Sequence, residues 1–341
     1  MTITMRRMNS DPSLAILISD QARERFETPI LRILNGRPVQ WVGLQATPDA
    51  QGHYPVDLAF LSRDVTGSSS KTVLTPTLER YYDILRHSPR LAWIQMHSAG
   101  ADRPIYQEML ARGVVVTSGS GANAKPVAQM ALAGLLALAR RLPVLMDSQR
   151  RRAWEPLLGP KAPKDLSGQT VMVVGWGPIG QEIGRLCKVL GMRVIGVRRE
   201  PHAPSVADEF IVYAEVTDHL PRADWVVLAC PLNDNTRGLL NSASLSLLPP
   251  GAHIINVSRG EVIDEPALIA ALQAGQVGGA FLDVFVKEPL DPSSPLWSLP
   301  QVMISPHSAG HTQGHYQAVA EIFFDNLGQW LAGQPMRNLV T

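Results

Sequence analysis

Apolar runs alternate with helical patterns in the first third of the chain, from Ser13 to about Gly119. The apolar runs predict buried strands, and amphipathic stretches between them predict helices. The expected strands are Leu14–Ile18, Gln40–Leu44, Val56–Leu61, Leu91–Met96 and Val114–Thr117, and the expected helices are Thr77–Arg86 and Pro104–Arg112. This alternation indicates parallel βα units.

A second alternating series begins near residue 170. Its expected strands are Thr170–Val174, Arg193–Val197, Glu209–Val212, Trp225–Ala229, His253–Val257, Gly279–Val284 and Val302–Ile304. The helices between them include Ile179–Leu190, which Gly191 should stop, and Glu265–Ala274, which Asp264 should cap. Two series of this kind predict an α/β protein made of two Rossmann-like or flavodoxin-like, doubly wound parallel-sheet domains with a cleft between them.

One long helix is expected between the two series, from Lys125 to about Gln149. Asn123 can act as its N-cap, Pro126 falls in its first turn, and Pro143 can kink or split it. The following stretch, Trp154–Lys164, is rich in Pro, Gly and Lys and predicts a surface connection. The last helix, about Gly314–Ala332, follows the final strand of the second series and can return to the first domain.

Composition and charge narrow the class of protein. The 341 residues are 45% hydrophobic, and the 31 basic and 30 acidic residues nearly cancel, so neither nucleic acid nor an anionic membrane is an expected partner. The longest apolar run, Met130–Ala139, is about half of what a membrane span needs. The cysteines are only two, Cys187 and Cys230, which fits a reducing compartment, so we expect a cytoplasmic protein. No apolar segment follows Arg6-Arg7, so we expect no signal peptide.

A glycine turn follows the first strand of the second series at once. The segment Gly175-Trp176-Gly177-Pro178-Ile179-Gly180 lies between an apolar strand and an amphipathic helix, as in a dinucleotide-binding βαβ unit. Gly175 allows the sharp turn, Gly177 lets the backbone approach a diphosphate, and Gly180 lets helix and strand pack closely. The helix N-terminus then meets the anion with free N–H groups.

Two arginines, Arg198 and Arg199, end the second strand of that unit. An acidic residue there would bind the ribose hydroxyls of NAD(H), whereas a guanidinium binds a 2′-phosphate through bidentate, charge-assisted bonds. The sequence therefore predicts that NADP(H) is preferred and that NAD(H) remains possible. The alternative is that these arginines only cover the adenine face or lie in solvent.

Three later strands end in segments whose residue types can bind a substrate or transfer a proton: Asn256–Glu261, Asp283–Pro289 and Ser305–Gly310. Reduction of a ketone by hydride transfer needs a proton donor, a group that polarises the carbonyl, and a cation for a substrate carboxylate. A histidine can supply the first and an arginine the other two, and a carboxylate can orient the imidazole. Ligands bind at such strand ends in open α/β sheets.

These segments, with Ser98-Ala99-Gly100-Ala101-Asp102 upstream, resemble the D-2-hydroxyacid dehydrogenase family over nearly the whole chain from about Val56. The resemblance implies that Arg259 binds a 2-keto acid, that His307 is the general acid/base, and that Glu288 is its partner. It also implies a carboxylate cradle at the backbone of Ala99 and Gly100. The cofactor contacts expected from the glycine turn, the arginines and the resemblance are Gly175, Trp176, Gly177, Pro178, Ile179, Gly180, Arg198, Arg199, Cys230, Pro231, Thr236, Val257, Ser258, Asp283 and Gly310.

The resemblance further implies a split first domain and a homodimer built around the cofactor domains. We assign residues 1–122 plus 309–341 to a substrate-binding domain and residues 123–308 to a dinucleotide-binding domain. The sequence departs from many family members at Lys125 and Gln129, where an acidic residue is common. No His/Cys/Asp cluster has metal-ligand spacing, so no metal is expected.

The function predicted from the sequence is reduction of a 2-keto acid, such as glyoxylate or hydroxypyruvate, to a D-2-hydroxy acid. A dinucleotide-sensing protein without turnover, like corepressors of this fold, remains the alternative. A formate dehydrogenase is disfavoured because it would carry glutamine at Glu288. His311 and His315 can line the cleft, and Trp154 can either pack in the core or reach a neighbouring subunit's substrate pocket.

Overall fold

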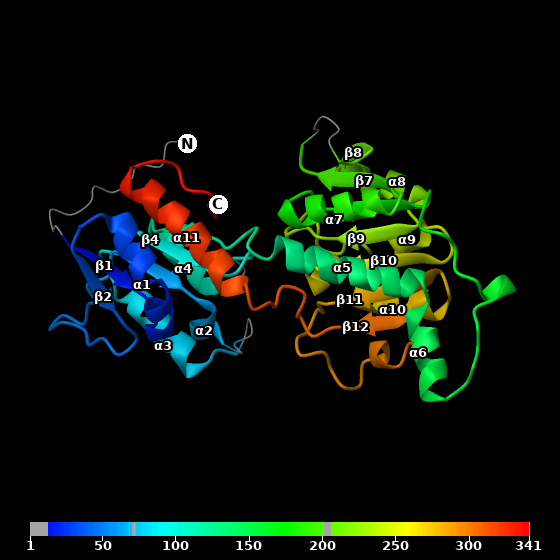
Figure 1. The fold of residues 1–341 in the computed structure, drawn as a ribbon, viewed down its shortest axis with the longest axis horizontal. Coiled ribbons are helices and arrows are strands. Elements are labelled where there is room, and N and C mark those ends of the chain that lie inside the picture. Colours follow the sequence, from blue (N-terminus) through cyan, green and yellow to red (C-terminus); the bar gives the residue numbers. More distant parts are fainter. Residues whose placement is uncertain (1–12, 68, 70–72, 102, 201–205, 341) are drawn as a thin grey trace. The chain divides into compact units, whose positions relative to one another are not determined.

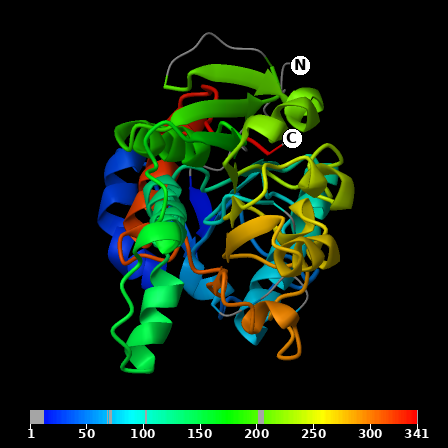
Figure 2. The same ribbon diagram turned by 90° about the vertical axis from the view of Figure 1, so that its right-hand side faces the viewer.

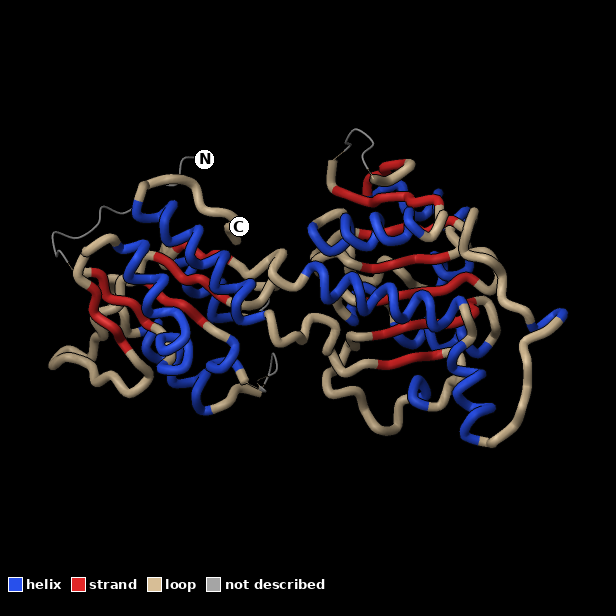
Figure 3. The backbone as a smooth tube through the Cα atoms, viewed as in Figure 1, coloured by secondary structure: helices blue, strands red, loops and turns tan. Residues whose placement is uncertain are grey.

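The computed structural model describes residues 13–67, 69, 73–101, 103–200 and 206–340. Residue contacts divide the chain into two compact units, residues 1–122 with 312–341 (unit 1) and residues 123–311 (unit 2). Each unit consists of one parallel sheet with helices on both faces (Figure 1, Figure 3). The predicted fold class, two doubly wound parallel α/β domains, is confirmed.

Unit 1 has a five-stranded sheet in the order β2-β1-β3-β4-β5, and every pair is parallel. The strands are β1 (Leu14–Leu17), β2 (Val39–Val42), β3 (Leu58–Leu61), β4 (Trp93–Met96) and β5 (Val115–Thr117), and the helices are α1 (Asp20–Leu34), α2 (Arg63–Thr66), α3 (Pro76–Arg86), α4 (Pro104–Ala111) and α11 (His315–Leu331). Consecutive residues of β1 point to opposite faces. Ala15 and Leu17 join a core under α3 and α4, while Leu14 and Ile16 join a core under α1 and α11.

Helix α1 was not among the predicted elements. Ser19 caps it by accepting a hydrogen bond from the Ala22 N–H, and its buried residues recur only every fourth position, at Ala22, Phe26, Ile30 and Leu34. Such a narrow apolar stripe, interrupted by Pro29 and surrounded by charged residues, gives a weak periodic signal. Packing against α11 and the sheet supplies the stability that the local sequence lacks.

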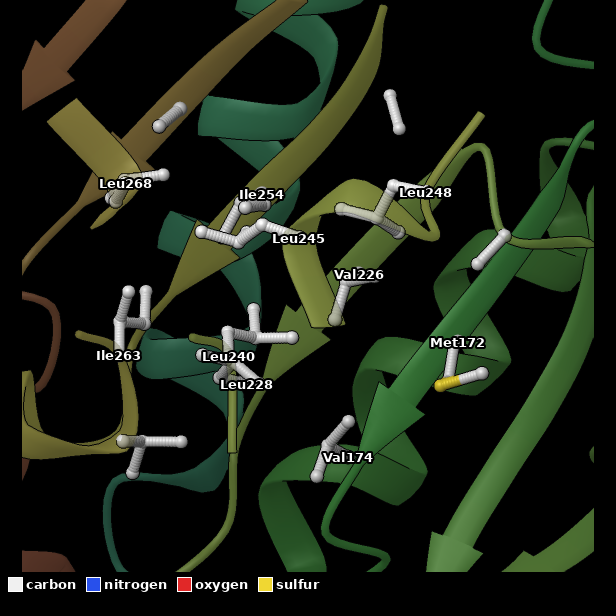
Figure 4. Packing of buried hydrophobic residues seen from close by; sticks show 14 of the residues in the cluster. Met172, Val174, Val226, Leu228, Leu240, Leu245, Leu248, Ile254, Ile263 and Leu268 are labelled. Atoms are coloured by element: carbon white, nitrogen blue, oxygen red, sulfur yellow. The ribbon is translucent and has the colours of Figure 1, made fainter. Parts of the chain in front are cut away.

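Unit 2 has a seven-stranded parallel sheet in the order β12-β11-β10-β9-β6-β7-β8. The strands are β6 (Thr170–Val174), β7 (Arg193–Arg198), β8 (Glu209–Val212), β9 (Trp225–Leu228), β10 (Ala252–Asn256), β11 (Val277–Leu282) and β12 (Val302–Ile304), and the helices are α5 (Ala124–Ala139), α6 (Leu142–Arg150), α7 (Pro178–Val189), α8 (Val216–His219), α9 (Ser242–Ser246) and α10 (Glu265–Gln273). Side chains from α8, α9 and α10 fill the core on one face, part of which Figure 4 shows, and α5 and α7 cover the other face.

The expected long helix after Asn123 is divided into two. Helix α5 ends at Ala139, Arg141 adopts a left-handed conformation with φ 54°, and α6 leaves at 69° with Pro143 in its first turn. The prediction that Pro143 can split the helix is confirmed, with the break placed just before it. In the part of the chain that the structure describes, no single helix is long and apolar enough to cross a membrane, and only α5 and α6 taken together reach that length and hydropathy.

Helix α6 and the segment that follows it project from the body of unit 2 (Figure 1, Figure 2). Arg151 ties this arm, residues 142–158, to itself through ion pairs of 2.8 Å with Asp147 and 2.6 Å with Glu155. The Trp154 side chain is 97% exposed, so the alternative prediction that Trp154 packs in the core of its own chain is wrong. The arm also exposes Leu158 and Met146, next to exposed charged residues that include Arg150 and Asp147.

Candidate active site

The glycine turn lies at the carboxyl edge of the unit 2 sheet, between β6 and α7. Gly175 has φ 99°, and a Cβ on it would fall 2.6 Å from Cα of Cys230, so only glycine fits there. A Cβ on Gly180 would collide with the carbonyl oxygen of Gly175. Gly177, by contrast, faces open space at the N-terminus of α7, where no side chain caps the helix. The turn therefore leaves an uncapped helix N-terminus that fits a diphosphate.

Trp176 sits inside this turn but points away from the helix N-terminus. Its ring is buried, packs edge-on against Phe210 at 5.1 Å, and fills the space left by Gly184 of α7 and Gly196 of β7. The Trp176 carbonyl accepts a hydrogen bond from Gln181. The indole therefore joins α7 to the sheet, and only the backbone of Trp176 faces the turn.

Arg198 and Arg199 follow at the end of β7, the strand next to β6. Arg198 is half-buried and its Nε is buried without a hydrogen-bond partner among the described residues, while Arg199 is exposed. An unpaired guanidinium N–H inside a protein is costly unless a ligand completes it. This end of the sheet thus fits an anionic group of a nucleotide.

Cys230, Pro231 and Thr236 form the turn after β9. Thr236 is fully buried, and its hydroxyl donates to the Pro231 carbonyl at 2.7 Å and accepts from the Asn233 N–H at 2.9 Å. Thr236 therefore holds the turn in shape from within. Burial raises the pKa of the Cys230 thiol to about 12, so this sulfur remains a protonated packing group.

Arg259 follows β10 and Ser258. Asn256 organises this segment, because its side-chain oxygen accepts from Ser258 and its amide donates to the Arg259 carbonyl at 3.0 Å. A Cβ on Gly260 would collide with the backbone of Phe285, so glycine lets the Arg259 segment lie directly against the loop after β11. Arg259 itself is half-buried and donates one hydrogen bond to the Ser258 carbonyl at 2.7 Å.

His307 and Glu288 meet at the ends of β12 and β11. His307 Nδ1 lies 2.8 Å from Glu288 Oε2, and the other carboxylate oxygen accepts from the Phe285 N–H at 3.1 Å. His307 has φ 51°, and its N–H donates to the Asp283 carbonyl at 2.8 Å. Because Glu288 occupies Nδ1, the imidazole presents Nε2 to a substrate.

Asp283 is almost fully buried and acts as the anchor of this loop. Its carboxylate accepts from the Ser305 hydroxyl and from the N–H groups of Ser308 and Ala309 at 2.8 and 3.1 Å. These bonds fix the backbone on either side of His307. Gly310 then lies close to Asn123, where a Cβ would come within 2.7 Å of the Asn123 amide nitrogen. Val257 and Ser258 are buried beside this edge of the sheet.

Most of the remaining predicted residues belong to unit 1. Ala99 is exposed and Gly100 is half-buried in the loop after β4, where the Ser98 hydroxyl donates to the Gly100 carbonyl; Asp102 lies outside the described residues. His315 is buried at the start of α11 with its ring 5.9 Å from that of His97, while His311 is exposed in unit 2. No group of three or more His, Cys, Asp or Glu side chains in the described ranges is arranged to hold a metal ion.

The sequence model of the NAD-binding domain of D-isomer specific 2-hydroxyacid dehydrogenases matches residues 132–309. The chain belongs to this family. Glyoxylate reductase from Thermococcus gammatolerans is 33% identical over 268 residues, which cover 76% of this chain and 78% of that protein. The region that holds the glycine turn, Arg259, Glu288 and His307 is thus the NAD-binding domain of a 2-hydroxyacid dehydrogenase family member.

Solved structures of dehydrogenases agree with this assignment. A D-isomer specific 2-hydroxyacid dehydrogenase from Xanthobacter autotrophicus Py2, in complex with NADPH and MES, is 27% identical with a TM-score of 0.75, covering 97% of this chain and 98% of that one. A family protein from Aeromonas salmonicida is 26% identical with the same TM-score and covers 97% and 99% of the two chains. The resemblance predicted from the motifs is therefore confirmed at the level of family and fold.

Proposed function

We propose that this dehydrogenase is an NADPH-dependent reductase that converts a small 2-keto acid, such as glyoxylate or hydroxypyruvate, into the D-2-hydroxy acid. The contact between His307 Nδ1 and Glu288 Oε2, at the edge of a dinucleotide-binding sheet, carries the proposal. The names of the relatives, among them glyoxylate reductases, support the substrate class.

His307 is the proposed proton donor in this reaction. NADPH, when bound, supplies a hydride to the 2-carbon of the keto acid. The His307 Nε2–H gives its proton to the carbonyl oxygen, so that a hydroxyl forms, and Glu288 holds the imidazole through Nδ1. Arg259 binds the substrate carboxylate and polarises the carbonyl. We assign a carboxylate cradle to the backbone N–H groups of Ala99 and Gly100 in unit 1.

The cofactor site combines the contacts described above. The glycine turn Gly175–Gly180 and the N-terminus of α7 hold the diphosphate, and the turn that starts at Cys230 lies along the dinucleotide. The orphaned Nε of Arg198 favours a 2′-phosphate over a bare ribose, and Arg199 adds a second charge. We therefore assign NADP(H) as the preferred cofactor and NAD(H) as a poorer one. Because cells keep the NADPH pool reduced, this preference favours formation of the hydroxy acid.

We further propose that residues 123–308 bind the dinucleotide, that residues 1–122 with 309–341 bind the substrate, and that the protein acts as a homodimer. Two exposed apolar side chains of the arm support the dimer, since Trp154 and Leu158 are 97% and 70% exposed and a second copy of the chain would cover them. Two free, buried cysteines fit a cytoplasmic location.

A panel of 2-keto acids, each assayed with NADPH and with NADH, tests the proposal. We expect turnover of glyoxylate or hydroxypyruvate with NADPH. Replacing His307 by alanine should abolish turnover while NADPH still binds, and His87→Ala, at an exposed histidine of unit 1, serves as the control. Tight NADPH binding without turnover of any keto acid would instead favour the dinucleotide sensor. A His307→Ala variant with near-normal kcat would reject His307 as the proton donor.

A further inference from the structure

Tyr213 lies at the carboxyl edge of the unit 2 sheet, the edge at which the glycine turn and the two arginines also lie. Neither of these two motifs predicts a role for Tyr213 from the sequence. Strand β8 pairs in parallel with β7, and Arg198 is opposite Val212. Arg199 is therefore the first residue after β7, and Tyr213 is the first residue after β8, where it begins a short 3-10 helix. Both strands end at the carboxyl edge, where nucleotides bind in such sheets.

The Tyr213 side chain packs against the apolar core on one face of the unit 2 sheet. It is half-buried there, and this core contains Val197, Ile211 and Cys230. Cys230 is also the residue whose backbone lies directly beside Gly175. The phenol thus belongs to the same edge of the sheet as the glycine turn on one side and the two arginines on the other.

The protonation state of this phenol suits a hydrogen-bond donor. Burial raises the pKa of Tyr213 to about 12, with a further increase from Cys230 and a partial decrease from the positive charge of Arg199. The hydroxyl is therefore protonated throughout the physiological pH range. Among the described residues, the structure shows no hydrogen bond from this hydroxyl to another side chain or backbone group.

We infer that Tyr213 is a specificity-determining residue whose hydroxyl donates a hydrogen bond to the 2′-phosphate of the cofactor, beside Arg198 and Arg199. This inference rests on the proposed use of NADPH. A phosphate offers three acceptor oxygens, and the orphaned Nε of Arg198, the exposed guanidinium of Arg199 and the phenol supply donors of the right kind from the ends of two adjacent strands. At its 2′ position, a ribose without the phosphate would offer them only one hydroxyl.

Calorimetric titration with adenosine 2′,5′-bisphosphate and with 5′-AMP tests this role without any turnover. The two probes differ only in the 2′-phosphate. We expect the wild-type protein to bind the bisphosphate more tightly than 5′-AMP. Tyr213→Phe should reduce this preference about tenfold, the lower end of what one hydrogen bond to a charged group contributes, with 5′-AMP affinity unchanged. Tyr316→Phe is the matched control, because Tyr316 lies in unit 1 with Arg25 over its ring.

Failure of the Tyr213 role and failure of the NADPH preference give different results in this titration. A wild-type protein that prefers the bisphosphate, with the same preference in Tyr213→Phe, overturns the role of Tyr213 and leaves the NADPH proposal intact. Equal weakening of both probes in Tyr213→Phe also overturns it, since it would show a contact to the adenine alone. A wild-type protein that binds both probes equally overturns the NADPH preference and the role of Tyr213 together.

Discussion

Neutralising Glu288 without changing its shape isolates what its charge does for His307. In Glu288→Gln the side chain can still accept the Phe285 N–H bond, so the loop after β11 should keep its conformation. The contact to His307 Nδ1 changes from a charge-assisted bond of 2.8 Å to a neutral one. The variant therefore tests orientation and charge stabilisation of the imidazole separately from folding.

The expected size of the effect follows from the exposure of the pair. Hydrogen bonds to charged groups contribute about 1.5–3 kcal/mol and neutral ones about 1 kcal/mol. The difference between the two kinds of bond is therefore about 0.5–2 kcal/mol. The His307 and Glu288 side chains are 48% and 33% exposed, so solvent screening places the effect in the lower half of this range, at about 1 kcal/mol. Because about 1.4 kcal/mol corresponds to a tenfold change in rate, kcat should fall roughly fivefold.

The assay is kcat for glyoxylate reduction with NADPH, followed across pH, with NADPH affinity measured on the same samples. Glu265→Gln is the matched control, since Glu265 Oε2 accepts the neighbouring Val286 N–H at 3.4 Å. We expect Glu265→Gln to keep wild-type kcat and both variants to keep wild-type NADPH affinity. An unchanged kcat in Glu288→Gln, or an equal decrease in Glu265→Gln, would refute the assigned role of Glu288.

Three further predictions concern the cofactor, the arm and the sheet. Arg198→Asp should reverse the ratio of kcat/KM for NADPH to that for NADH, whereas Arg193→Asp at the other end of β7 should leave it unchanged. Trp154→Ser should raise the dimer dissociation constant, measured by sedimentation equilibrium, tenfold or more, roughly what a central aromatic contact contributes. The same substitution at another exposed tryptophan, Trp297→Ser, should leave the dissociation constant unchanged, since Trp297 is 54% exposed but lies outside the arm. Burial lowers the pKa of His253 from 6.5 to about 4. The neutral histidine therefore makes its full contribution to the stability of the fold above pH 6.5. This contribution, up to about 3 kcal/mol, is lost as the pH falls toward 4. His253→Phe preserves the stack on Trp225 and should flatten the pH dependence of the unfolding free energy over that interval; the same slope in the variant would show that another group titrates.

The strands of both sheets could be predicted because they are fully buried. Runs such as Thr170–Val174 and Trp225–Leu228 are apolar on both faces, as strands covered by helices must be. The order of the strands could not be predicted in the same way, since β6 pairs with both β7 and β9 through contacts that no local pattern records. Helix α1 was missed because its stability comes from α11, almost 300 residues later in the chain.

The candidate site shows a similar division. The motifs predicted which side chains carry chemistry, and the structure places His307 and Glu288 in contact. The motifs did not distinguish side chains that face a ligand from those that shape the backbone. Trp176 and Thr236 point into the protein, and the Asp283 carboxylate accepts hydrogen bonds from the His307 loop. Burial and hydrogen bonding determine the direction of a side chain, and the spacing of residues in a motif contains no information on either.

Helix α11 has a consequence for how the protein is made. Its Phe323 stacks on Phe60 at 4.6 Å, and its Asn326 donates to Gln95, a residue 231 positions earlier in the chain. As the chain leaves the ribosome, the sheet of unit 1 emerges first but lacks the helix that covers one of its faces. Unit 2 is continuous in sequence and can close before unit 1 does. We therefore expect the nascent sheet of unit 1 to keep aromatic surface exposed until the entire second unit has been synthesised.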